Sequence, residues 1–74
     1  MTLSDELKKY GVEVEYEDAN RLRLRVKEGF YLASLDKKLL EKLLSYNVVE
    51  IASGDGSTVV YVYRDEIRNL LGKA

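Results

Sequence analysis

Apolar and charged residues alternate strictly in two neighbouring stretches of the chain. Residues 12–17 read VEVEYE and residues 21–27 read RLRLRVK. A period of two places alternate side chains on opposite faces of a strand. Asp18 and Asn20 favour a turn in the three residues between the runs. The pattern predicts an antiparallel hairpin with one apolar face and one charged face.

A three-residue turn also predicts how the two strands of this hairpin pair. On the apolar face the expected pairs are Val12 with Val26, Val14 with Leu24, and Tyr16 with Leu22. On the charged face the expected pairs are Glu13 with Arg25, Glu15 with Arg23, and Glu17 with Arg21. A slip of one residue would break both sets, so the hairpin specifies its own register.

Three segments show helical periodicity instead: residues 3–10, 35–46 and 65–71. The second is the most amphipathic, and we expect Ser34 to cap its amino end. Its apolar stripe consists of Leu35, Leu39, Leu40, Leu43 and Leu44. Stripes of this width on short helices indicate packing against a sheet or against other helices.

A second hairpin is predicted at residues 48–53 (VVEIAS) and 58–63 (TVVYVY). The turn Gly54-Asp55-Gly56-Ser57 joins them, and Asp-Gly between apolar runs is a strong hairpin signal. Its position between two strands also argues against a phosphate-binding loop, because such a loop opens a helix. One charged residue is too few for a calcium loop.

This second hairpin is apolar on both faces. An even-numbered loop pairs Ile51 with Val60 and Val49 with Val62 toward the helices. The other face, beside Glu50, then carries Val48, Ala52, Val59, Tyr61 and Tyr63. An odd-numbered loop would exchange the faces and expose Val60 and Val62 instead.

The order of elements suggests a repeat. LKKYGVEVE at residues 7–15 aligns with LLSYNVVEI at residues 43–51, which places the pseudo-repeats at about 3–28 and 35–64. We therefore expect a single α+β domain over residues 1–74, in the order αββαββα. Two αββ repeats would form a four-stranded antiparallel sheet with helices packed on one face, and residues 65–71 would form the closing helix.

Composition removes most catalytic classes. The 74 residues include no Cys and no His, so disulfides, thiolate zinc sites and cysteine nucleophiles are excluded, and the commonest general base is missing. The 12 basic and 13 acidic residues give a formal net charge of −1, which offers no general attraction to nucleic acid or anionic membranes. We expect no enzyme, no cofactor and no metal.

The remaining composition bears on location. Gln, Pro and Trp are missing while Glu, Lys and Arg are plentiful, a bias typical of proteins from hot environments and shared by designed sequences. The first ten residues are charged and amphipathic, unlike a signal peptide, and no apolar run is long enough to cross a bilayer. A cytoplasmic location is the default expectation.

Two functions stay open. The apolar face of the second hairpin suggests a protein-interaction module that binds itself, most simply as a twofold dimer, or another protein. Residues 30–32 or the terminal helix could instead cover that face.

The alternative function is nucleic-acid binding through the basic row and the sheet tyrosines. The row consists of Arg21, Arg23, Arg25 and Lys27. The opposing glutamates argue against it, so the deciding feature is whether these arginines are bound to glutamates or free.

Overall fold

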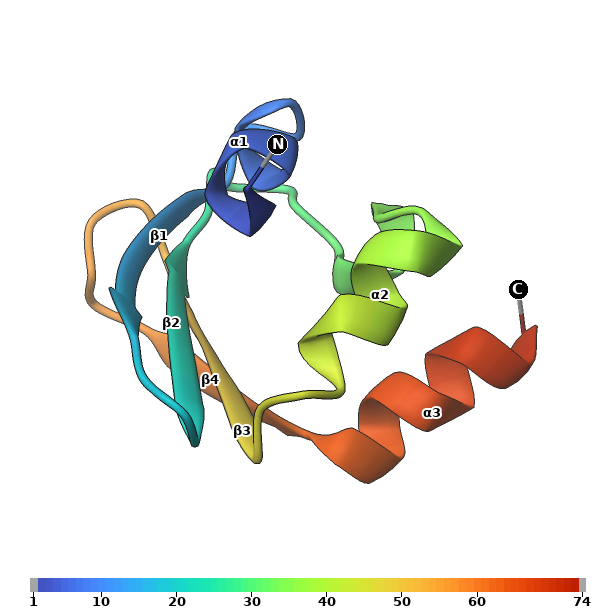
Figure 1. Ribbon diagram of the computed structural model, residues 1–74. Coiled ribbons are helices and arrows are strands. Elements are labelled where there is room, and N and C mark those ends of the chain that lie inside the picture. Colours follow the sequence, from blue (N-terminus) through green and yellow to red (C-terminus); the bar gives the residue numbers. More distant parts are fainter. Residues whose placement is uncertain (1, 74) are drawn as a thin grey trace.

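The computed structural model describes residues 2–73 and has an α+β fold with a four-stranded mixed sheet and three α-helices (Figure 1). The elements in chain order are α1 (Leu3–Lys8), β1 (Glu13–Glu17), β2 (Arg21–Arg25), the 3₁₀ turn η1 (Leu32–Ser34), α2 (Lys37–Leu43), β3 (Val48–Ala52), β4 (Val59–Tyr63) and α3 (Arg64–Lys73). Every predicted helix and strand is found: α1 and the four strands are one or two residues shorter than predicted, α2 is five residues shorter, and α3 is three residues longer.

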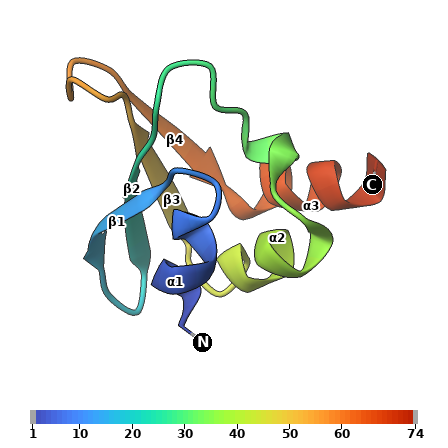
Figure 2. The same cartoon turned by 90° about the horizontal axis from the view of Figure 1, so that it is seen from above.

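The helices lie on one side of the sheet and leave its other side uncovered (Figures 1 and 2). The core lies between the two layers, where the alternating leucines of β2 meet the apolar stripe of α2. The largest fully buried side chains are Leu7, Val12, Leu22, Leu24, Leu43, Val49 and Ile67. Only one face of each strand therefore contributes to the core, as expected for a sheet covered on one side.

The sheet has the strand order β1-β2-β3-β4, but the prediction that it is wholly antiparallel was wrong, because β2 and β3 pair in parallel. Residues 26–47 cross the helical side of the sheet and bring the chain back to the end where β2 begins. There the backbone oxygen of Asn20 accepts hydrogen bonds from the N–H groups of Asn47 (2.8 Å) and Val48 (3.2 Å). A crossover that contains a helix is the usual connection between parallel neighbours.

The structure does not confirm the αββ repeat. β1 runs antiparallel to β2, and β2 runs parallel to β3, so β1 and β3 point in opposite directions. Superposing the first αββ unit on the second would therefore carry its helix to the opposite face of the sheet. The helices share one face instead, so the two units are not structural copies.

The first hairpin contains a β-bulge that the predicted register lacked. The pairs Glu13–Arg25 and Val14–Leu24 are as predicted, and the register then shifts before Tyr16. The predicted pairs Glu15–Arg23, Tyr16–Leu22 and Glu17–Arg21 were wrong, because Tyr16 lies opposite Arg23 and Glu17 lies opposite Leu22. One extra residue in β1 reverses the facing of everything after it.

The turn that follows accounts for the shift. One carboxylate oxygen of Asp18 accepts hydrogen bonds from the backbone N–H groups of Asn20 and Arg21, both at 2.8 Å. The other accepts from the Tyr16 hydroxyl at 2.7 Å. Glu17, displaced to the helical side, accepts a hydrogen bond from the Tyr46 hydroxyl. These hydrogen bonds stabilise the bulged arrangement over the regular one.

Two helix starts differ from the prediction. Asp36, not Ser34, caps α2 by accepting a hydrogen bond from the backbone N–H of Leu39 at 2.9 Å. Ser34 ends η1 and donates its hydroxyl to the backbone oxygen of Tyr31. α3 begins at Arg64, directly after β4, so no loop separates the last strand from the last helix.

The second hairpin has the even-numbered of the two loop registers that the sequence left open. Val49 pairs with Val62 and Ile51 with Val60, and the register continues unbroken from Val48–Tyr63 to Ala52–Val59. The N–H of Ser53 donates to the oxygen of Thr58 at 2.8 Å and closes the turn. The faces of β3 and β4 are thereby fixed.

Candidate functional site: the open face of the sheet

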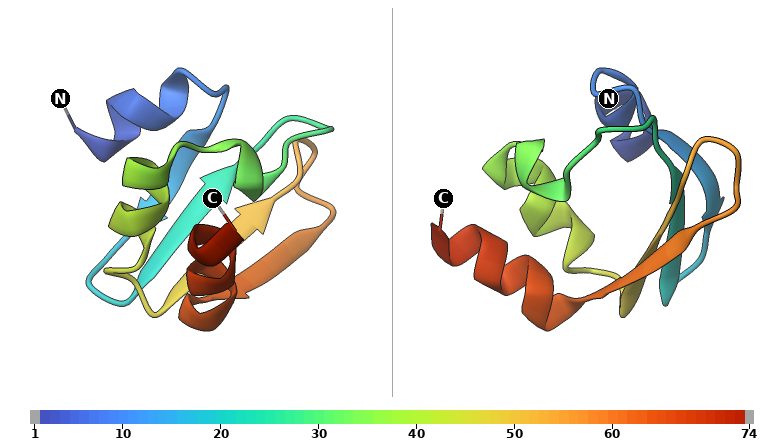
Figure 3. Two further views of the ribbon diagram at one scale, coloured as in Figure 1. Left: turned by 90° about the vertical axis from the view of Figure 1, so that its right-hand side faces the viewer. Right: turned by 180° about the vertical axis from the view of Figure 1, so that it is seen from behind.

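The uncovered side of the sheet, which we call the open face, consists of three rows of side chains across β2, β3 and β4. The parallel pairing of β2 with β3 brings the arginine strand next to the second hairpin (Figure 3). The rows are Arg21–Val48–Tyr63, Arg23–Glu50–Tyr61 and Arg25–Ala52–Val59.

Glu50 lies at the centre of the open face and is only 4% exposed. Its two carboxylate oxygens contact different arginines: Arg21 Nε at 3.2 Å and Arg23 Nη1 at 3.1 Å. A buried carboxylate needs such partners, because an unpaired charge there would lose its hydration without compensation. Glu50 therefore holds two arginines against the sheet.

Glu15 binds the other end of the arginine row from the bulge in β1. Its carboxylate lies 2.7 Å from Arg25 Nη2 and 3.3 Å from Arg23 Nε. The hydrogen bond from Arg25, followed by the charges of Arg25 and Arg23, lowers the pKa of Glu15 below its ordinary value. Arg25 also donates to the backbone oxygen of Gly54 at 3.0 Å. All three arginines are thus bound to carboxylates.

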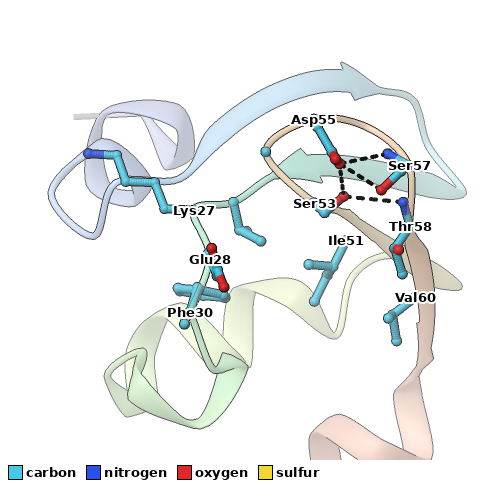
Figure 4. Close-up of a pocket in the computed structure, with 12 residues that line it drawn as sticks. Lys27, Glu28, Phe30, Ile51, Ser53, Asp55, Ser57, Thr58 and Val60 are labelled. Carbon is cyan, nitrogen blue, oxygen red and sulfur yellow. Dashed lines mark hydrogen bonds between the residues drawn. The ribbon is translucent and has the colours of Figure 1, made fainter.

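Arg21 and Lys27, at the two ends of the basic row, have different surroundings. The Arg21 guanidinium carbon is 4.5 Å from the ring centre of Tyr16, a cation–π contact that the bulge makes possible. Lys27 follows β2 and lies beside Gly11, with its ammonium turned away from the β3–β4 turn (Figure 4). Lys27 is therefore not part of the arginine–glutamate network.

The half of the open face over β3 and β4 carries exposed tyrosines. Tyr61 is 53% exposed and Tyr63 is 56% exposed, while Val48 and Val59 are half-buried beside them. Ala52 lies on this face, as the even-numbered loop predicted, but it has no exposed area. We call the four remaining residues the apolar strip.

Neither segment expected to cover the apolar strip does so. α3 packs on the helical side, where Ile67 belongs to the core. Residues 30–32 also lie on the helical side, where Phe30 packs at the edge of the core. Within residues 2–73, the apolar strip therefore stays open.

A cavity of about 520 Å³ lies on the helical side, between residues 26–30 and the turn of the second hairpin. Ile51 and Val60 point into it from β3 and β4 (Figure 4). Val60 is 53% exposed although it faces the helices, which the sequence reasoning did not anticipate for an even loop. The signal for this exposure was the place of Val60 on the last strand, which lies at the edge of the sheet.

The acidic residue of the turn is occupied by its own neighbours. One Asp55 oxygen accepts hydrogen bonds from the Ser57 N–H (2.9 Å), the Ser57 hydroxyl (2.7 Å) and the Ser53 hydroxyl (2.8 Å), as Figure 4 shows. These hydrogen bonds, with those from Ser57 largest, lower the pKa of Asp55 to about 2. The turn thus uses its carboxylate for its own structure.

No family model matches this chain, and no curated protein or solved structure resembles it significantly. Among residues 2–73, no three acidic side chains gather closely enough to hold a metal ion. No helix within the same range has the length and apolar character needed to cross a membrane.

Proposed function

We propose that this protein is a non-enzymatic protein-interaction module that forms a homodimer through the apolar strip. The observation that carries the proposal is the pair Tyr61 and Tyr63, each more than half exposed on a sheet face that no helix covers. Tyrosine suits an interface because its ring buries apolar area while its hydroxyl stays near water.

The surroundings of the apolar strip support the same conclusion. Next to it, the guanidinium groups of Arg21 and Arg23 are already paired with the carboxylate of Glu50. A twofold contact over Tyr61 and Tyr63 would leave this cluster as a polar rim. A domain of 74 residues buries a smaller share of its surface than a larger one, so additional burial stabilises it appreciably.

Nucleic-acid binding remains the alternative, with Arg21, Arg23 and Arg25 as its phosphate contacts and the sheet tyrosines as stacking surfaces. It has less support, because each of the three guanidinium groups is bound to Glu15 or Glu50. A phosphate would have to displace a carboxylate from each of them. The two carboxylates beside these arginines would repel the phosphates and weaken the attraction for a polyanion.

Sedimentation equilibrium tests the proposal. We expect the parent protein to dimerise and Tyr63→Glu to be a folded monomer, because a carboxylate at the centre of an apolar contact loses its hydration. Tyr31→Glu is the matched control, since Tyr31 is 74% exposed and lies away from the open face. A parent protein that is monomeric at several hundred micromolar, or a Tyr63→Glu variant that dimerises like the parent, contradicts the proposal.

Fluorescence anisotropy with labelled single-stranded DNA and RNA tests the alternative. We expect no binding at low ionic strength. Binding that weakens steeply with added salt and is lost in Arg21→Ala would favour nucleic acid over the interaction module.

A further inference from the structure

We propose, on the basis of the proposed function, that the second copy docks along the free edge of β4. The two β4 strands would pair antiparallel around a twofold axis at Tyr61 and join the sheets of both copies into one. Such a dimer differs from one in which two open faces stack on each other.

The two edges of the sheet are very different. β1 carries a bulge and three glutamates, features that prevent an edge strand from pairing with another chain. β4 (Val59–Tyr63) carries no charge and no proline and keeps an unbroken register with β3. No part of residues 2–73 lies beyond this strand in the plane of the sheet (left view of Figure 3). β4 therefore has an unprotected edge.

The backbone of β4 presents pairing groups to that edge. The Ser53–Thr58 pair is hydrogen-bonded, so the next pair, Ala52–Val59, is of the type whose polar groups point away from each other. Ala52 fits this, since its oxygen accepts a hydrogen bond from the Val26 N–H on the β2 side at 3.0 Å. By the same alternation, the N–H and C=O of Val59 and Tyr61 face the free edge.

The sequence of β4 complements itself about Tyr61. With the twofold axis there, Tyr61 meets Tyr61 of the second copy and Val59 meets Tyr63 of the second copy, all on the open face. Val60 meets Val62 of the second copy on the helical face. No like charges oppose one another, and aromatic and β-branched residues are favourable cross-strand pairs. The residues with edge-facing polar groups are the ones that this register aligns.

Val60 distinguishes edge pairing from stacking of open faces. It is 53% exposed on the helical side, beside the cavity, whereas Tyr61 and Tyr63 are exposed on the other side. Stacked open faces would cover the tyrosines and leave Val60 in water. Pairing along the edge extends the valine layer of the core into the second copy. One arrangement thus accounts for exposed apolar residues on both faces of β4.

The deciding experiment compares dimerisation of three single variants with that of the parent by sedimentation equilibrium, with circular dichroism to confirm folding. A contact of one short strand is small, so we expect a parent dissociation constant on the order of 1–100 µM. Val60→Lys should weaken the dimer roughly tenfold or more, which is about 1.4 kcal/mol. Tyr61→Glu should weaken it similarly, and Tyr31→Lys, at an exposed position off the sheet, should leave it unchanged.

The outcomes separate the two proposals. If Tyr61→Glu abolishes the dimer and Val60→Lys does not, edge pairing is wrong and dimerisation through the open face stands. A monomeric parent contradicts both, as does a dimer that neither variant affects. A second measurement is independent of mutation: hydrogen exchange at the Tyr61 amide should slow as the parent concentration rises through the dissociation constant. An exchange rate that stays constant across that range overturns edge pairing.

Discussion

Glu50 has a structural role that the counts of acidic and basic residues do not reveal. It is buried at the centre of a sheet face, yet each of its oxygens contacts an arginine that keeps much of its own side chain in water. Such an ion pair loses part of its hydration on folding, and its charge-assisted hydrogen bonds compensate for the free energy of that loss. The net contribution is small, but removing one partner leaves the others without compensation.

We therefore expect Glu50→Gln to lower the free energy of unfolding by about 1–2 kcal/mol, because Arg21 and Arg23 lose their shared carboxylate. Glu13→Gln is the control: Glu13 is exposed on the edge strand, and its change should stay within about 0.5 kcal/mol. Urea unfolding followed by circular dichroism measures both. Equal effects of the two substitutions would show that Glu50 is not held as described.

Asp55 makes a pH dependence measurable at a single residue. Its pKa falls from 3.8 to about 2 on folding, so the folded state favours the carboxylate. A lowered pKa contributes stability above the unfolded value of 3.8, and that contribution disappears as the pH falls toward 2. We expect the parent to lose stability between these pH values more steeply than Asp55→Asn.

Chemical denaturation at a series of pH values measures that difference, and an NMR titration of the Asp55 carboxyl gives the pKa directly. Glu15 and Asp18 also have lowered pKa values, so the parent curve contains their contributions as well. Only the difference between parent and variant reports on Asp55. Parallel curves for the two proteins would contradict the hydrogen bonds assigned to this turn.

At the scale of elements, the turns determine the strand register and the facing of side chains more than the strands that they join. The strands of both hairpins are apparent from alternation, but the facing of Tyr16 and Glu17 depends on one extra residue in β1. That bulge depends in turn on hydrogen bonds to Asp18. Strict alternation favoured the regular register because that register pairs every glutamate of β1 with an arginine of β2. The folded chain instead forms the hydrogen bonds of the Asp18 turn, and the register shifts.

The glycines allow a matched test of the turn in the second hairpin. Gly56 has φ of +76°, and a Cβ added there would lie 3.1 Å from Arg25 Nη1. Gly56→Ala should therefore destabilise the protein by about 1 kcal/mol or more, because it combines backbone strain with displacement of Arg25.

Gly72 is the control, since it lies within α3 and a Cβ there would meet nothing within 4 Å. Gly72→Ala should be neutral or stabilise by up to about 1 kcal/mol, because alanine favours the helix. Thermal unfolding of both variants measures the contrast. If Gly56→Ala is as well tolerated as Gly72→Ala, the turn does not have this conformation.

At the scale of the whole molecule, a single connection places the candidate site. Residues 26–47 return the chain to the start of β2, so the arginine strand and the second hairpin become neighbours. The open face is consequently divided into an ion-paired polar half and an apolar half. The apolar half extends to the unprotected edge of β4.

A dimer through that edge links assembly to stability. Because folding and association are coupled, the midpoint of thermal unfolding of the parent should rise with protein concentration. Val60→Lys should show a weaker dependence, since it acts on the interface and not on the core. Differential scanning calorimetry over a hundredfold concentration range measures this. A midpoint that does not change with concentration would contradict association of the folded protein.

The sequence by itself determined the elements and most of their faces. Alternation and helical periodicity predicted every strand and helix, and they limited the facing of β3 and β4 to two alternatives, one for an even-numbered loop and one for an odd-numbered loop. It also identified Tyr61, Tyr63 and the arginine row as surface candidates. These features depend on neighbours within a few residues, which a pattern records directly.

Only the tertiary structure decided how these elements meet. The parallel pairing of β2 with β3, the burial of Glu50 between Arg21 and Arg23, and the exposure of Val60 all depend on residues 20 or more positions apart or on strand order. The local pattern of residues cannot determine the direction in which a crossover returns. Each hairpin forms its own internal hydrogen bonds whether the neighbouring hairpin pairs with it in parallel or antiparallel. That direction is set by how the helices cover the sheet, a property of the packed chain as a whole.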